Sequence, residues 1–194
     1  KLKAAMNSFV NNGEIVLTFS FVSGERQLFN VRPYLFPKME AKRENVKKEE
    51  TKSYVKLSTT GMSITIGKQS GLIDYIDMDG QPMLVDRQSV TPEFWRAPTD
   101  NDYGAWLQRR WAVWKSPQMK VTKLTMEGNS VTADLDLPEV KGKLIMTYTL
   151  QSDGCILVRQ QLKADKEAKD MWLFRYGMQL QMPKRYNTIK YYGR

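Results

Sequence analysis

The chain of 194 residues contains no histidine and only one cysteine, Cys155. Without histidine, the chain cannot perform histidine-based acid–base catalysis or bind a metal through imidazole. A single cysteine cannot form an internal disulfide, so the fold does not depend on crosslinks. The sequence also has no run of about 20 apolar residues, and we predict no membrane-spanning helix and no membrane partner.

Several catalytic and binding motifs are missing as well. The sequence has no glycine-rich phosphate loop and no serine nucleophile elbow. Asp100-x-Asp102-x-Gly104 contains part of an oxygen-ligand loop, but the later ligands of a calcium-binding hand are absent. Cys155 lies in a predicted apolar strand with no histidine to activate its thiol. We therefore expect no catalytic residue, no metal site and no cofactor in this chain.

The net charge of +9 raises the question of a nucleic-acid partner. The basic residues are spread along the sequence, however, and the densest segment, residues 38–52, also contains four glutamates. No nucleic-acid-binding signature accompanies them. We interpret the basic residues as solvated surface charge and predict no nucleic-acid partner.

Changes in composition divide the chain into three parts. Residues 1–7 lack a signal-peptide core and an initiating methionine, so we expect the chain to begin inside a longer protein. Residues 14–22 alternate apolar and polar side chains, and residues 27–31 predict a second strand, so 1–37 is either the tail of a preceding β domain or a hairpin that belongs to the next one. The charged segment 38–52 is a predicted linker with at most a helical turn. Residues 53–194 form the second domain.

From Tyr54 onward the sequence predicts one short strand about every 8–12 residues, separated by turns. This spacing is typical of an antiparallel sandwich or barrel. Asp79-Gly80 is a residue pair that suits a tight hairpin. The predicted strands are 54–59, 62–66, 72–78, 83–86, 121–126, 131–137, 144–150, 156–162, 172–180 and 186–192.

One short helix is predicted at residues 105–115, and Pro117 ends it. Leu107, Trp111 and Trp114 fall at helical spacing and share one face. The tryptophans allow two interpretations: they stack on a sugar, or they fasten the helix to the sheet. For Trp111 and Trp114 the stripe favours packing. Trp106 lies off the stripe, so both interpretations stay open there.

Residues 94–104, Phe-Trp-Arg-Ala-Pro-Thr-Asp-Asn-Asp-Tyr-Gly, precede this helix. Pro98 disfavours both helix and central strand, and the three Asx residues favour turns. The segment therefore predicts an irregular loop anchored by its aromatic residues, although a capped strand-to-helix connection explains the same pattern. We expect an arginine–carboxylate pair and turn hydrogen bonds to hold the loop rigid. The candidate site residues are Arg96, Asp100, Asn101, Asp102, Gly104 and Trp106.

The same eleven residues resemble the signature that opens the C-terminal small-chain domain of large bacterial family-2 β-galactosidases. A second group supports the resemblance: Arg175-Tyr176-Gly177-Met178, Met182-Pro183 and Tyr191-Tyr192-Gly193-Arg194. The resemblance covers residues 53–194, and residues 14–31 look like the end of the immunoglobulin-like domain that precedes it. The resemblance thus implies that 1–37 holds the closing strands of that domain. It implies an all-β fold, the first half of a galactose-mutarotase-like supersandwich.

The resemblance also implies that the chain is a non-catalytic piece of a larger soluble bacterial enzyme, cytoplasmic or periplasmic. The parent would hydrolyse terminal β-D-galactosides with retention, using two glutamates of a barrel domain. Its magnesium and sodium sites, if it has them, would lie upstream, and a homo-oligomeric parent is expected. The partners of this chain would be the barrel domain and, through the whole enzyme, the galactoside.

In the family, the loop that starts at the glycine matching Gly104 closes over the substrate. Here the segment between Gly104 and Trp111 is short and carries Trp106, which departs from that pattern. We expect the candidate residues to shape one wall of a substrate pocket. Two alternatives remain: a structural or oligomer-forming sandwich, and a carbohydrate-binding module.

Overall fold

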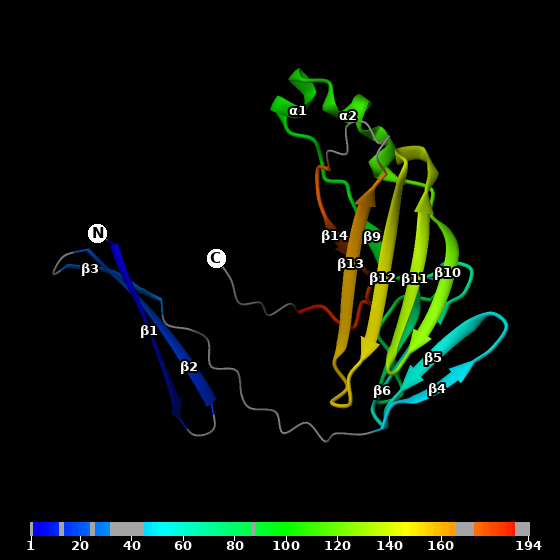
Figure 1. The fold of residues 1–194 in the computed structure, drawn as a ribbon, viewed down its shortest axis with the longest axis horizontal. Helices are drawn as coiled ribbons and strands as arrows, with labels where there is room; N and C mark the ends of the chain where they lie inside the picture. Colours follow the sequence, from blue (N-terminus) through cyan, green and yellow to red (C-terminus); the bar gives the residue numbers. More distant parts are fainter. Residues whose placement is uncertain are drawn as a thin grey trace. The chain divides into compact units, whose positions relative to one another are not determined.

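A computed structural model of the chain describes the backbone of three strands within residues 2–31, and backbone and side chains over residues 45–86, 88–165 and 173–188. The chain forms two compact units, Lys1–Ala41 with Thr188–Arg194, and Lys42–Asn187. Figure 1 shows the strands of both units as arrows. The described secondary structure is predominantly antiparallel β, as the strand pattern predicted.

The first unit contains an antiparallel sheet in the order β1-β2-β3. Its strands are β1 (Leu2–Asn11), β2 (Glu14–Ser23) and β3 (Arg26–Val31). The strands predicted at residues 14–22 and 27–31 are therefore present. β1 was not predicted, because its apolar residues do not follow a clean alternation. β1 pairs with β2 along its whole length, from Leu2↔Ser23 to Asn11↔Glu14. The assignment of this unit to an immunoglobulin-like domain stays a prediction.

The second unit is a sandwich of two antiparallel sheets (Figure 1). One sheet has the order β4-β5-β6-β7-β8, with strands β4 (Lys47–Glu50), β5 (Tyr54–Ser58), β6 (Met62–Gly67), β7 (Ile73–Met78) and β8 (Gln81–Pro82). The other has the order β10-β11-β12-β13, with strands β10 (Lys120–Glu127), β11 (Ser130–Leu137), β12 (Gly142–Leu150) and β13 (Ile156–Ala164). The 3₁₀ turn η2 (Pro138–Val140) joins β11 to β12.

Two predictions differ from the structure in the first of these sheets. Strand β4 lies inside the segment predicted as a linker, and all four of its side chains are exposed. It is an edge strand held by backbone pairing to β5, so no apolar pattern marked it. The strand predicted at 83–86 is instead β8 at 81–82, because the positive φ angles of Asp79 and Gly80 close a two-residue hairpin at once.

The hydrophobic core lies between the two sheets. Along β11 every second residue is buried, and β12 continues the same alternation. The fully buried side chains come from both layers and include Leu57, Ile64, Ile66 and Ile73 on one side and Leu135, Leu144, Met146 and Leu150 on the other. Apolar side chains that recur every second residue give each sheet one apolar face, and the two sheets form a sandwich by burying these faces against each other.

A close contact between the layers occurs at Gly71. The hydroxyl of Tyr148 on β12 donates to the carbonyl of Gly71 over 3.1 Å. Gly71 has φ +67°, and a Cβ there would lie 3.0 Å from Val121 Cγ2 and 3.1 Å from Ala133 Cβ. The position therefore requires glycine both for its backbone angle and for the space around it. Burial, followed by the carboxylate of Asp74, raises the pKa of Tyr148, so its phenol remains a proton donor.

A two-stranded sheet brings two distant segments together at one end of the sandwich. Strand β9 (Thr91–Glu93) pairs with β14 (Gly177–Gln179), with Gly177 opposite Glu93. The strand predicted at 172–180 is thus much shorter in the described residues, since Leu173 to Tyr176 approach β9 without strand pairing. Trp172 and most of the strand predicted at 186–192 lie outside the described residues, and Tyr186 to Thr188 are not in a strand.

The helical region follows β9 and projects beyond the ends of β12 and β13 (Figure 1). It consists of α1 (Asp100–Gly104), α2 (Leu107–Arg110) and the 3₁₀ turn η1 (Ala112–Lys115). The single helix predicted at 105–115 is therefore wrong in its start and its continuity. Trp106 adopts a left-handed conformation, which interrupts the helix, and the Asx residues form a turn of helix of their own. No helix in the described residues is long and apolar enough to cross a membrane.

The Gly71 contact predicts a difference between two glycine substitutions. Gly71→Ala should lower the free energy of unfolding by about 2–4 kcal/mol, because it combines a strained φ angle with overpacking between the sheets. Gly80→Ala is the matched control: its φ is +76°, but a Cβ there would meet nothing within 4 Å. It should cost only about 1–2 kcal/mol. Urea denaturation of both variants measures the difference; equal losses would contradict the role of close packing at Gly71.

Candidate functional site

An aromatic cluster fastens the helical region to the sandwich. Phe94 is buried at the end of β9, and its ring meets the buried Trp114 edge to face at 5.3 Å. Phe174 approaches from the chain near β14, with its ring 4.8 Å from Trp95 and 5.2 Å from Trp111. The interpretation of Trp111 and Trp114 as packing residues is confirmed, since both belong to or pack against the core.

The two motifs that carry the family resemblance meet in this cluster. Gly177 of the second motif pairs with Glu93, the residue before Phe94, and the ring of Tyr176 lies 6.0 Å from that of Phe94. Phe174 was predicted only as one residue of an alternating strand. Its role as the ring against which Trp95 and Trp111 pack was not predicted, because this role depends on a contact between segments that are far apart in the sequence. Tyr191 to Arg194 of the second motif lie outside the described residues.

Arg96 and Asp102 form the expected arginine–carboxylate pair. Nη1 of Arg96 donates to Oδ2 of Asp102 over 2.7 Å, and Nη2 donates to Oδ1 over 3.3 Å. The guanidinium also donates to the carbonyl of Ala97 and lies 5.1 Å from the centroid of the Phe174 ring. This two-pronged geometry joins the start of the segment to α1, six residues later.

Thr99 completes the arrangement at the start of α1. Its backbone N–H and its hydroxyl both donate to Oδ2 of Asp102, over 2.7 and 2.9 Å. Thr99 is the N-cap residue, so Asp102 at position N3 satisfies a free N–H at the helix start. We call the set Arg96, Thr99 and Asp102 the clamp. It makes the stretch after Pro98 a capped helical turn, so the capped strand-to-helix connection is confirmed and the irregular loop is wrong there.

The clamp keeps Asp102 ionised although its side chain is only 10% exposed. The hydrogen bonds from Arg96, then that from the backbone of Thr99, lower the pKa of Asp102 to about 2. Burial opposes this shift but does not outweigh the donors. At neutral pH the carboxylate is an acceptor only and has no proton to give.

The structure gives the other predicted site residues different places. Asp100 and Asn101 lie on α1 with exposed side chains, outside the clamp. Gly104 is the last residue of α1, its φ is not positive, and a Cβ there would meet nothing within 4 Å. The left-handed backbone conformation in this region occurs two residues later, at Trp106. Whether these residues contact a substrate stays a prediction.

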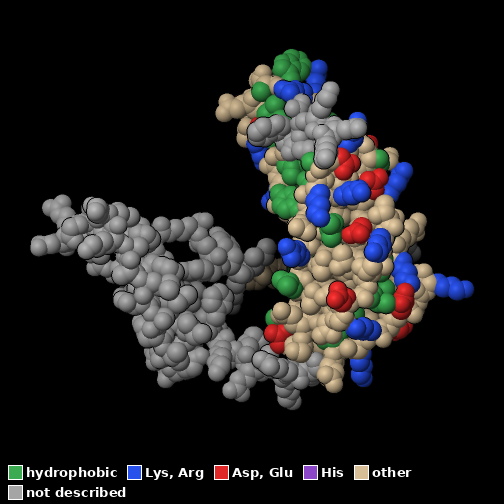
Figure 2. All heavy atoms as spheres, in the orientation of Figure 1, with side chains coloured by type: hydrophobic (Ala, Val, Ile, Leu, Met, Phe, Trp, Pro, Cys, Tyr) green, Lys and Arg blue, Asp and Glu red, His purple; other side chains and the backbone are tan. Residues whose placement is uncertain are grey.

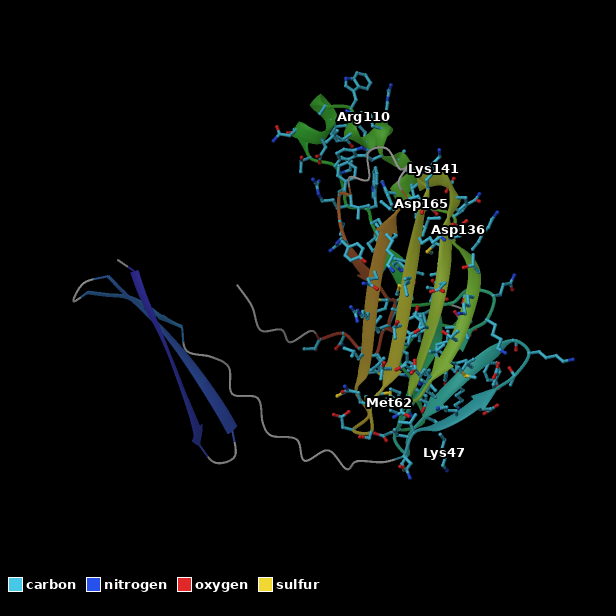
Figure 3. All side chains as sticks on the ribbon, viewed as in Figure 1. Lys47, Met62, Arg110, Asp136, Lys141 and Asp165 are labelled. Atoms are coloured by element: carbon cyan, nitrogen blue, oxygen red, sulfur yellow. The ribbon has the colours of Figure 1, made fainter. Side chains whose placement is uncertain are left out.

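Trp106 is the N-cap of α2 with φ +57° and ψ 24°, and its side chain is 56% exposed. The guanidinium carbon of Arg109 lies 4.4 Å from the centroid of its ring. Tyr103, one turn earlier, is 53% exposed. Figure 3 shows the neighbouring Arg110 beyond Lys141 and Asp165, which mark the same end of the sandwich, whereas Met62 and Lys47 mark the other end. The tip of the helical region therefore carries exposed aromatic and basic side chains.

Other candidate chemistry is sparse among the described residues. They contain no group of three or more histidine, cysteine, aspartate or glutamate side chains that can hold a metal ion. Cys155 is exposed and directly precedes β13 rather than lying within a strand. The carboxylate of Asp153 raises the pKa of its thiol, which disfavours the reactive thiolate.

The charged side chains do not collect into a single patch on the face in view. Figure 2 shows lysine and arginine interspersed with aspartate and glutamate over the sandwich. Mixed charge of this kind is typical of a solvated surface. The prediction that the chain has no nucleic-acid partner stays a prediction.

Comparisons with known proteins agree on one family. The family model described as beta galactosidase small chain matches residues 58–194. A beta-galactosidase of Priestia megaterium is 27% identical over 146 residues, covering 71% of this chain and 14% of the relative. Beta-galactosidases of Staphylococcus xylosus and Lactobacillus delbrueckii subsp. bulgaricus are 26% and 34% identical, over 79% and 52% of this chain. The chain spans between 10% and 17% of the length of these relatives.

The low pKa of Asp102 predicts a pH dependence of stability. A carboxyl whose pKa is lowered in the folded state stabilises the fold above its unfolded pKa of about 4. That contribution is lost as the pH falls from about 4 toward the folded value of about 2. Wild type should therefore exceed Asp102→Asn in stability at pH 5–7, and the difference should shrink below pH 4. Urea denaturation midpoints of both proteins from pH 2 to 7 measure this; a constant difference would contradict it.

Proposed function

This chain belongs to the beta-galactosidase small chain family, and from that premise we propose that it is a non-catalytic part of a larger beta-galactosidase. The whole enzyme would belong to glycoside hydrolase family 2 and hydrolyse terminal β-D-galactosides with retention. The proposal assigns the nucleophile, the acid/base glutamate and any magnesium and sodium sites to the remainder of that protein. The short share of the relatives that the chain spans supports this division.

The observation that carries the proposal is that the clamp fixes a helical turn between buried aromatic residues and an exposed tip. Four hydrogen bonds converge on the Asp102 carboxylate, two from Arg96 and two from Thr99. Behind the clamp, Phe94 and Trp114 are buried in the core. Ahead of it, Tyr103 and Trp106 are exposed. A rigid connection between a packed base and an exposed tip is suited to presenting a surface to another part of a protein.

The chemistry of the clamp supports a positioning role rather than proton transfer. A retaining glycosidase needs two carboxyl groups about 5 Å apart, one of which gives and takes a proton. Asp102 is the only carboxylate among the buried residues that the structure describes. Its oxygens already accept hydrogen bonds from Arg96 and Thr99. With a pKa of about 2 it cannot serve as an acid near neutral pH. We propose that the clamp holds one wall of the substrate pocket while groups elsewhere perform the hydrolysis.

Two alternatives rest on particular residues. A structural or oligomer-forming sandwich is favoured by Trp114, which is buried, and by Trp95 and Trp111, which pack against the core. A carbohydrate-binding module is favoured by the exposed rings of Tyr103 and Trp106. The pocket-wall proposal accounts for both groups of aromatics with one arrangement. We also propose that the parent enzyme is a homo-oligomer, as the family resemblance implies.

The division of labour predicts that the 194-residue chain is inactive alone. It should not hydrolyse o-nitrophenyl β-galactoside, and lactose should produce no measurable heat in a calorimetric titration. The physical reason is that the two reacting carboxyl groups lie in another part of the enzyme. Hydrolysis that persists after contaminating enzymes have been removed from the purified chain would overturn the proposal.

A second prediction concerns Arg96 in the whole enzyme. Arg96→Lys keeps the charge but loses the two-pronged donor geometry, so the clamp loosens. We expect kcat/KM to fall about three- to tenfold, because a displaced wall weakens substrate positioning by about the value of one hydrogen bond. Steady-state kinetics with lactose measures this.

The matched control is Arg159→Lys on the exposed side of β13, at a position with no part in the clamp. It should leave the kinetics unchanged. If Arg96→Lys folds normally and its kcat/KM equals that of the control, the clamp has no influence on the pocket.

A further inference from the structure

Trp106 occupies a position that local structure disfavours in three ways. A left-handed backbone suits glycine or asparagine and strains a bulky residue. The N-cap of a helix suits serine, threonine, aspartate or asparagine, and Trp106 makes no side-chain cap. Its large apolar ring is also 56% exposed, the highest fraction among the exposed large hydrophobic residues described. A residue that breaks local rules without a local gain indicates a functional position.

Hydrogen bonds from the surrounding backbone hold Trp106 in this conformation. Its own N–H donates to the carbonyl of Tyr103 over 3.1 Å. Its carbonyl accepts from the N–H groups of Arg109 and Arg110, each over 3.1 Å. The ring is thus presented from a fixed backbone rather than from a free loop, and the clamp fixes the helical turn before it.

The ring does not contribute to the packing of the sandwich. The core and the partly buried residues against it include Trp111, Val113 and Trp114 of the same region, but not Trp106. Packing therefore explains the other tryptophans and leaves Trp106 unexplained. Its described partner is Arg109, whose guanidinium lies over one face of the ring, 4.4 Å from the centroid.

The pair of an indole ring and a guanidinium matches the chemistry of a pyranose. The C–H face of a galactose ring is apolar and packs on aromatic rings, while its hydroxyl oxygens accept hydrogen bonds from guanidinium N–H groups. We propose that Trp106 is a substrate-contacting residue that stacks on a sugar ring of the galactoside through the indole face that Arg109 does not cover, with Arg109 as the adjacent hydrogen-bond donor. This inference rests on the proposed function, because it places the tip at the substrate pocket of the whole enzyme.

The test substitutes Trp106 by asparagine in the whole enzyme. Asparagine tolerates the left-handed backbone, so the variant keeps the local fold while it removes the ring. We expect KM for lactose to rise about tenfold with kcat little changed, a loss of about 1.4 kcal/mol of binding shared by ground and transition states. Trp106→Phe should recover part of the loss, because a smaller aromatic face remains. The melting temperature of Trp106→Asn should not fall, since backbone strain is relieved.

Leu157→Asn is the matched control. Leu157 is 55% exposed, and its strand, β13, begins at the end of the sandwich opposite α1 and α2 (Figure 1). This variant should change neither KM nor kcat. A melting temperature that falls in Trp106→Asn with unchanged KM would assign Trp106 a structural role and overturn the inference.

The outcomes separate this inference from the proposed function. If Arg96→Lys lowers kcat/KM and Trp106→Asn leaves KM unchanged, the pocket wall stands and the stacking contact is wrong. If neither substitution affects kinetics, the pocket wall itself is wrong. If Trp106→Asn instead weakens assembly of the enzyme in sedimentation experiments with KM unchanged, the tip is a protein-docking surface and the sugar contact is refuted.

Discussion

The pairing of Arg96 with the Asp102 carboxylate is the constraint on which the candidate site depends. A carboxylate that is only 10% exposed is costly unless donors compensate it, and here two groups do so from opposite ends of one short segment. Arg96 reaches it from the chain that leaves β9, and Thr99 reaches it from the start of α1. The pair therefore fixes both the exit of the chain from the sandwich and the direction of the first helical turn.

The ring of Phe174 supports that pairing. Phe174 packs against the guanidinium of Arg96 and also contacts Trp95 and Trp111. One ring therefore joins the clamp to the aromatic cluster that packs on the sandwich. β14 brings Phe174 there by pairing with β9. A pairing of two short strands thus positions the site, while the larger sheets supply the rigid body beneath it. The division between a packed base and a presented tip follows from this arrangement.

Much of the fold follows from local sequence patterns. The alternation at 131–137 and 144–150 reports a sheet with one buried face, and the structure places every second residue of β11 and β12 in the core. Asp79-Gly80 closes the tight hairpin it predicted, with positive φ at both residues. Elements without an apolar pattern were missed: β4, which is charged and exposed, is held only by backbone pairing to its neighbour.

The sequence by itself determined the all-β class, the place of the turn-rich segment 94–104 and the presence of an arginine–carboxylate pair, because these depend on residue types and short spacings. Tertiary structure decided which of the Asx residues is the partner, since only position N3 of α1 turns toward Arg96 and Thr99. It also placed a left-handed backbone conformation at Trp106 and brought the ring of Phe174 against the guanidinium of Arg96. The Phe174 contact joins segments far apart in the chain, which no local pattern records. The choice of Asp102 and the backbone of Trp106 depend on the helical geometry of residues close in sequence, which residue types alone do not specify.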